Sequence, residues 1–288
     1  MSPFSEMRLV VGRELKKNLR SIKGLILLVI SLLGASATAF RLRAIEIDVK
    51  DVPDATPAMI HELKAEVIKQ AFYHDTAVAD YLANAPLKLV LIFFLAVWLS
   101  PMLVTLMGFD LVSSETQYRT ARYWTVRTRR GSYFFGKFLG LWAVMAAVTF
   151  VMHLLTWIVV LARGEAGLGE TLSWGIRFWL FALPVSAIWC GLATFLGSLF
   201  RTPILSLLTI CLTFALIFFF GFAIDAIVSA GSKGVDHVTW LTYIYPNTYD
   251  AWLASPLAYR AGLGFLICLG YAGLPTAAGA LIFARRDI

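Results

Sequence analysis

Six long stretches without a charged residue constrain the fold of this 288-residue chain more than any other feature. About 20 apolar residues cross the roughly 30 Å hydrocarbon layer of a membrane as an α-helix, which satisfies its backbone hydrogen bonds internally. The sequence therefore predicts an all-α integral membrane protein with six transmembrane helices, forming a single domain over residues 1–288. The charge-free stretches are 24–40, 89–109, 138–162, 178–200, 202–224 and 261–284.

The distribution of charge predicts which side of the membrane each connection occupies. Six spans place both termini on one side, together with residues 110–137 and Arg201. That side carries 15 basic and 5 acidic residues, against 10 basic and 13 acidic residues on the other. Because cytoplasmic loops are enriched in Lys and Arg, we expect both termini to be cytoplasmic, in the cytoplasmic (inner) membrane of a bacterium. The excess of basic residues then indicates topology and contact with anionic lipid, not binding of nucleic acid.

Residues 1–23 are predicted to form an amphipathic helix at the membrane surface before the first span. Its basic residues, expected to position it on the membrane, are Arg8, Arg13, Lys16 and Lys17. Opposite them, apolar residues recur every three or four positions, namely Phe4, Met7, Val11, Leu15, Leu19 and Ile22. A cleaved signal peptide is the alternative interpretation, since small residues follow the first apolar stretch. The length and pattern of the basic region favour a retained helix.

The largest outer connection, residues 41–88, is acidic on balance. Thr56 and Pro57 are typical of a helix start, and the predicted helix runs to about Ala83. Its expected buried stripe consists of Met59, Ile60, Leu63, Val67, Ile68 and Phe72. The loop is interpreted either as a lid packed on the spans or as a contact for a substrate or an outer accessory protein.

The second outer segment, residues 225–260, is rich in Tyr and Trp. An aromatic belt at the lipid headgroups explains this composition. A gate at the outer mouth, with Tyr245, Tyr249 and Trp252, is the alternative. Asp250 lies in the same segment, and we expect it to be solvated.

No pattern in the sequence predicts catalysis or cofactor binding by this chain. Gly131–Lys137 fits the first seven positions of a phosphate-binding loop, but Phe138 replaces the required Ser or Thr and no strand precedes the motif. Gly136 and Gly140 instead form a small-x-x-x-small face that allows close helix packing. The three cysteines are interpreted as small buried hydrophobic residues, and no metal site is predicted. His153, inside the third stretch, is expected to have a structural role.

Residues 110–137, which we call the coupling segment, form a polar and basic island between the second and third spans. Its arginines alternate with Tyr118, Tyr123 and Trp124. Anchoring at the lipid surface would account for the charge alone. Arg and aromatic residues together are typical of protein interfaces, so a short helix that docks into a partner protein is the favoured interpretation.

On these residues the chain resembles the permease subunits of type-2 ABC exporters. In that family this connection starts near a Glu, passes a Gly-Thr and an Arg-containing apolar stretch, and ends in Gly-Lys. Glu115, Thr120, Gly136 and Lys137 match that pattern, whereas Arg119 stands where Gly usually precedes Thr. The closing sequence FARRDI also resembles the usual cytoplasmic end of the family.

The resemblance implies that the chain is the membrane subunit of an ATP-driven exporter and hydrolyses nothing itself. ATP and magnesium would bind to a separate ABC ATPase subunit, present in two copies, and a second permease copy would complete a homodimer. The residues predicted to couple to the ATPase are Glu115, Thr120, Arg122, Tyr123, Trp124, Arg127, Arg129 and Arg130. The alternatives are an ion-coupled secondary transporter and a non-transporting membrane scaffold that recruits a partner.

Overall fold

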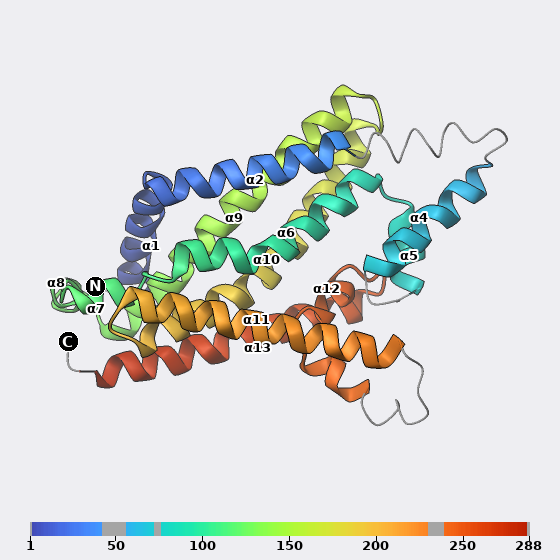
Figure 1. Ribbon diagram of the computed structural model, residues 1–288. Coiled ribbons are helices and arrows are strands. Elements are labelled where there is room, and N and C mark those ends of the chain that lie inside the picture. The colour runs from blue at the N-terminus through green and yellow to red at the C-terminus, as the bar shows by residue number, and fades with distance from the viewer. Residues whose placement is uncertain (1, 42–55, 72–75, 230–238, 287–288) are drawn as a thin grey trace.

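Six long helices run side by side in the computed structural model, which describes residues 2–41, 56–71, 76–229 and 239–286 (Figure 1). All six are long and apolar enough to cross a membrane, which confirms the predicted spans. The described residues include no β-strand. The six helices are α2 (Ile22–Arg41), α6 (Leu87–Gly108), α9 (Arg130–Ala162), α10 (Leu168–Leu199), α11 (Pro203–Ser229) and α13 (Ala258–Arg285).

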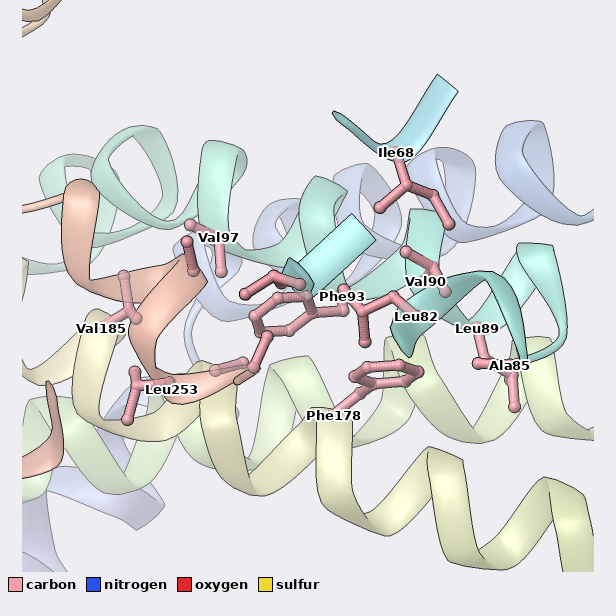
Figure 2. Packing of buried hydrophobic residues seen from close by; sticks show 14 of the residues in the cluster. Ile68, Leu82, Ala85, Leu89, Val90, Phe93, Val97, Phe178, Val185 and Leu253 are labelled. Carbon is pink, nitrogen blue, oxygen red and sulfur yellow. The ribbon is translucent and has the colours of Figure 1, made fainter. Parts of the chain in front are cut away.

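The centre of the bundle is α10, which packs against α6, α9, α11 and α13. In the most apolar 18-residue stretch of α10, 72% is buried inside the protein, whereas the corresponding share for α11 is only 22%. Figure 2 shows Phe178 of α10 close to Phe93 of α6 in the main cluster of buried side chains, and the two rings stack 5.5 Å apart. α11 therefore lies at the edge of the bundle, with most of its apolar side chains directed outward.

Helices α9 and α10 begin well before the charge-free stretches that predict them. α9 starts at Arg130 instead of 138, and α10 starts at Leu168 instead of 178. A helix continues past the apolar layer wherever capping and packing allow it, so the absence of charge marks the membrane crossing and not the helix ends. Gly131–Lys137, which fits part of the phosphate-binding pattern, consequently forms the first two turns of α9.

One end of the bundle, which we call the basic end, carries residues Pro3–Leu19, which we call the entry helix, and the coupling segment. α1 (Pro3–Leu19) lies across this end, and the chain turns at Arg20 and Ser21 into α2 (Figure 1). Within the coupling segment, two short helices, α7 (Ser113–Gln117) and α8 (Ala121–Thr125), precede the start of α9. The last turn of α13 lies at the same end.

The opposite end carries four short elements. They are α4 (Pro57–Ala71), α5 (Thr76–Ala83), the 3-10 helix η2 (Thr239–Ile244) and α12 (Thr248–Leu253). As predicted, Thr56 caps α4, because its Oγ1 accepts a hydrogen bond from the backbone N–H of Met59 at 3.4 Å. The single helix predicted to run to about Ala83 is instead two helices that pack on each other, and the second, α5, ends at Ala83 as expected.

The predicted buried stripe of α4 is largely wrong. Ile68 is 2% exposed and packs on the main cluster, but Met59, Leu63 and Val67 are about half exposed. Phe72 lies outside the described residues. Apolar residues at helical spacing show that a helix has an apolar face, but they do not show that another element covers that face.

Candidate functional site

Three charged side chains meet inside the protein where α1, α7 and α9 come together. Nζ of Lys137 lies 2.8 Å from Oε1 of Glu14 and 2.6 Å from Oε1 of Glu115. Lys137 and Glu14 are fully buried, and Glu115 is 5% exposed. The Tyr133 hydroxyl donates a hydrogen bond to the second carboxylate oxygen of Glu115. One lysine thus connects the entry helix, the coupling segment and the third span.

Arg13 completes what we call the buried ion cluster, formed by Arg13, Glu14, Glu115 and Lys137. Its Nη1 lies 3.4 Å from Oε1 of Glu115, and its Cζ lies 4.2 Å from the centre of the Trp124 ring. The cluster contains two cations and two carboxylates, so its formal charge is zero. Burying an unpaired charge costs several kcal/mol, and this balance allows three charged groups to lie in the interior beside Arg13, whose side chain is 34% exposed.

Two glycines make this close approach of α1 and α9 possible. A Cβ atom on Gly136 would lie 2.7 Å from Cβ of Val10, and one on Gly140 would lie 2.7 Å from Cβ of Glu14. Both distances are too short for real Cβ contacts. The predicted small-x-x-x-small face is therefore confirmed, and the element packed on it is the entry helix.

The entry helix has three faces instead of the two predicted. Glu6, Val10, Glu14 and Asn18 share one face, which is buried against α9. Phe4 and Leu19 on the apolar face are exposed, as expected for side chains that contact lipid. The basic residues Arg8, Lys16 and Lys17 occupy a third face and are also exposed, whereas Arg13 turns toward the cluster.

Glu6 attaches the other end of α1 to the coupling segment. Its Oε2 accepts a hydrogen bond from the backbone N–H of Arg129, the N-cap residue of α9, at 3.0 Å. A negative charge at a helix N-terminus is favourable because the first N–H groups have no partners within the helix. This hydrogen bond holds the pKa of Glu6 below its ordinary value.

Two arginines bind backbone carbonyl groups at the C-terminal ends of α13 and α10. Nη1 of Arg130 lies 2.8 Å from the carbonyl oxygen of Ala284 and 3.0 Å from that of Arg286. Arg286 in turn donates to the carbonyl oxygens of Ser198 and Leu199 at the end of α10. The last carbonyls of a helix lack partners within it, and these guanidinium groups supply them. Movement of the start of α9 would therefore be transmitted to both helices.

The residues predicted to couple to a partner separate into an anchored group and an exposed group. Glu115 is buried in the ion cluster, Trp124 is partly covered by Arg13, and Arg130 binds the end of α13. Thr120 is partly buried between α7 and α8. Arg122, Tyr123, Arg127 and Arg129 are exposed, and their neighbours Tyr118 and Val126 are 71% and 86% exposed.

The turn between α7 and α8 requires a left-handed residue, and Arg119 occupies that position. Its φ is +56°, which makes it the one residue other than glycine with positive φ in the part of the chain that the structure describes. A side chain at this φ costs about 1–2 kcal/mol because Cβ approaches the following carbonyl oxygen. The Gly that the resemblance leads one to expect here would adopt this φ without strain, and Arg119 takes its place in this chain.

Sequence reasoning identified Glu115 but missed Glu14, the other carboxylate of the ion cluster, and also Glu6. Glu6 and Glu14 are two acidic residues in a strongly basic segment, and they share a helix face with Val10 and Asn18. That spacing was a detectable signal of a buried polar face, but their partners lie 123 residues away in the sequence. Lys137, which completes the apparent phosphate-binding pattern, is enclosed by two carboxylates. This arrangement agrees with the interpretation that the motif does not bind nucleotide.

The other sequence-based candidates are also placed by the structure. Tyr245 and Tyr249 are each 5% exposed, and the ring of Tyr249 lies 5.4 Å from that of Trp252, which is partly exposed. Cys190 and Cys268 are buried as expected, but Cys211 is exposed on α11. Within the described ranges, no group of three His, Cys, Asp or Glu residues could hold a metal ion.

These features define a multi-pass membrane protein with a basic and aromatic surface rigidly attached to one end of its helix bundle. Over residues 8–288 the sequence matches the family described as ABC-2 family transporter protein, and the chain belongs to that family. It is therefore the membrane subunit of an ABC transporter, and the family implies association with an ABC ATPase subunit. A comparison with curated proteins gives no match.

Proposed function

We propose that this chain couples ATP hydrolysis in a separate ATPase to export of a substrate across a bacterial cytoplasmic membrane, with the basic end in the cytoplasm. The observation that supports this most is that the coupling segment has an exposed surface and is also held by a buried residue inside the bundle. Tyr123, 77% exposed, lies on α8, and Glu115, 5% exposed, lies on α7 within the same coupling segment. Family membership favours this function over an ion-coupled transporter or a scaffold.

Exposed Arg and aromatic side chains are well suited to bind a cleft in the ATPase. Such residues dominate the energetics of protein interfaces because they combine apolar area with directional hydrogen bonding. In this proposal Arg122, Tyr123, Arg127 and Arg129 contact the ATPase, and two ATPase copies bind one permease dimer. The exposed basic residues Arg8, Lys16 and Lys17 contact anionic headgroups beside it.

In this proposal the buried ion cluster transmits movement of the docked coupling segment to the helix bundle. A push on α7 and α8 reaches α9 through Glu115 and Lys137, and it reaches α1 through Glu14. Packed interfaces of this kind move as rigid bodies between discrete arrangements. Nucleotide-driven closure of the ATPase would thus shift α1 and the start of α9 as one unit.

A second copy of this chain is the proposed partner within the membrane. A groove of about 710 Å³ opens between α2, α6 and α11, and its lining is almost entirely apolar. It lies beside α11, the span with the smallest buried share. A homodimer that pairs these faces would cover the groove and place a pathway between the copies.

The test of ATPase docking is copurification from membranes in mild detergent. We expect the double variant Arg122→Glu and Arg129→Glu to lose the ATPase while the permease still inserts into the membrane. The matched control is Arg8→Glu with Lys16→Glu, which places the same charge change on the entry helix and should retain the ATPase. Undiminished copurification by the coupling-segment variant would overturn the proposal.

A further inference from the structure

The one acidic side chain of α12, Asp250, is buried at the opposite end of the bundle from the ion cluster. It is 2% exposed, which corrects the expectation that it is solvated. The reason is that residues 248–253 turn back among the spans, where Tyr249, Ala251 and Leu253 join the main buried cluster. Figure 2 shows Leu253 close to Val185 of α10. α12 is therefore a re-entrant helix, packed against α10 and α13.

The surroundings of Asp250 favour its neutral form. Its burial does so, whereas the backbone N–H of Ala251, which donates to Oδ1 at 2.6 Å, partly opposes this effect because it favours the ionised form. Cys268 of α13 is a titratable group that interacts with it electrostatically, and Cys268 and Tyr271 of α13 and Tyr243 of η2 surround the neighbouring Tyr249. The nearest basic side chain along the chain, Arg260, stacks over the ring of Trp252. Burial raises the pKa of Asp250 to about 7.

Asn247 lies one helical turn before Asp250 and is 1% exposed. Neither atom of its side-chain amide has a hydrogen-bond partner among the described residues. As the N-cap residue of α12 it makes no side-chain cap either. An amide offers both an acceptor for a protonated carboxyl group and a donor for an ionised one. Asn247 can therefore serve Asp250 in both protonation states.

We propose that Asp250 and Asn247 form a proton-binding site which controls whether the re-entrant helix α12 stays seated in the bundle. With the proton bound, the carboxyl group is neutral and α12 remains packed between α10 and α13. Loss of the proton places an uncompensated negative charge among apolar side chains, which is expensive, and α12 moves toward water. The proton is the only ligand required, and it leaves to bulk water.

Movement of α12 would carry the aromatic residues of this end with it. The Tyr249 hydroxyl donates to the carbonyl oxygen of Tyr243 at 2.6 Å, and the Thr248 hydroxyl donates to that of Thr242 at 2.6 Å. These bonds join η2 to α12, so the two elements form one unit that includes the proposed outer gate of Tyr245, Tyr249 and Trp252. Gating by this unit rests on the proposed transport function, whereas proton binding does not.

The test is hydrogen–deuterium exchange of residues 239–255 in the full-length protein, in lipid nanodiscs and without ATPase. After correction for intrinsic exchange, we expect opening of α12 to rise at least about tenfold as pH increases from about 5.5 to 8.5. Asp250→Asn imitates the protonated acid and should keep α12 protected throughout. The control Asp80→Asn removes an exposed carboxylate, 75% exposed in its pair with His61, and should behave like the wild type.

Protection that does not change with pH in the wild type, or an unchanged response in Asp250→Asn, would overturn the proposal. A second measurement on the wild type alone guards against a variant that fails to fold. With carbonyl-labelled aspartate, infrared difference spectra should contain a protonated carboxyl band near pH 6 that disappears above about pH 8. Absence of that band would equally overturn it. Both results are independent of ATPase docking, which the arginine variants test separately.

Discussion

Lys137 and Glu14 pair across 123 residues of sequence, with Nζ 2.8 Å from Oε1 and neither side chain exposed to solvent. This contact fixes the entry helix to the third span. Glu115 shares the same lysine, so the pair also determines the position of the coupling segment.

Replacing Lys137 with Met should destabilise the protein strongly. Removal of one partner from a buried ion pair costs about 3–5 kcal/mol, because the remaining charge stays buried without compensation. The matched control is Lys69→Met, which removes an exposed pair with Glu66 and should cost less than about 1 kcal/mol. Unfolding of the purified protein in detergent measures both, and equal losses would contradict a structural role for the cluster.

Gly136→Ala should weaken the packing of α1 on α9. The added Cβ would lie 2.7 Å from Cβ of Val10, and overpacking of this kind costs about 1–3 kcal/mol. Hydrogen exchange of residues 3–19 should accelerate in the variant. Gly131→Ala, in the same helix with open space around the new methyl group, should leave exchange unchanged. Similar exchange in the two variants would show that the close contact is unimportant.

Arg119→Gly should stabilise the coupling segment. Glycine adopts the observed φ of +56° without strain, and the gain should be about 1 kcal/mol after its larger entropy in the unfolded chain is subtracted. Gln117→Gly, inside α7 at ordinary helical φ, should instead destabilise by a similar amount. Melting temperatures of the two variants should shift in opposite directions. A lower melting temperature for Arg119→Gly would mean that the arginine side chain contributes more than its strain costs.

Glu6 should make the docking of α1 dependent on pH. Because its pKa is lowered in the folded protein, its contribution is complete above its ordinary value of 4.5 and is lost as pH falls through the lower folded value. The stability difference between wild type and Glu6→Gln should therefore shrink as pH decreases from about 6 to 3. Glu62→Gln, at an exposed site, is the control. A difference that stays constant over this range would exclude the hydrogen bond to Arg129 as its source.

Cys211 offers a direct test of the proposed dimer face. It is exposed on α11 and lines the groove, whereas Cys190 and Cys268 are buried. A short thiol cross-linker applied to membranes should therefore give a covalent dimer of the wild type. Cys211→Ser should abolish that product, and Cys190→Ser should retain it. A monomer that remains uncross-linked while detergent-solubilised protein is dimeric would place the interface elsewhere.

The sequence predicted the spans because the absence of charge over a membrane thickness is a local property. The packing partners of α1 could not be predicted in the same way, since Glu14 meets Lys137 only once the bundle has assembled. Met59 and Leu63, which are half exposed, and Asp250, which is buried, were all three assigned wrongly. In each case the polarity of the side chain suggested whether it would be buried. The position of its helix in the folded protein gives it the opposite environment.

The residue types of the coupling segment predicted which residues belong to it. They did not predict which of these residues are anchored to the bundle and which are only exposed. Arg129 and Arg130 are neighbours in sequence and both are exposed, yet the guanidinium of Arg130 binds the end of α13. Arg129 is the extended N-cap residue and Arg130 the first residue of α9, and no sequence pattern encodes this boundary. The Gly-Lys ending was recognised from resemblance, and the structure supplies its physical reason, a close helix contact beside a buried cation.

The acidic face of α1 has a consequence for biosynthesis. The ribosome makes Glu6 and Glu14 before their partners, each of which follows 123 residues later. Until then this leading helix can rest on the membrane surface with its carboxylates in water, but it cannot settle against the spans. α1 therefore reaches its final place only after the start of α9, against which it packs, has been made.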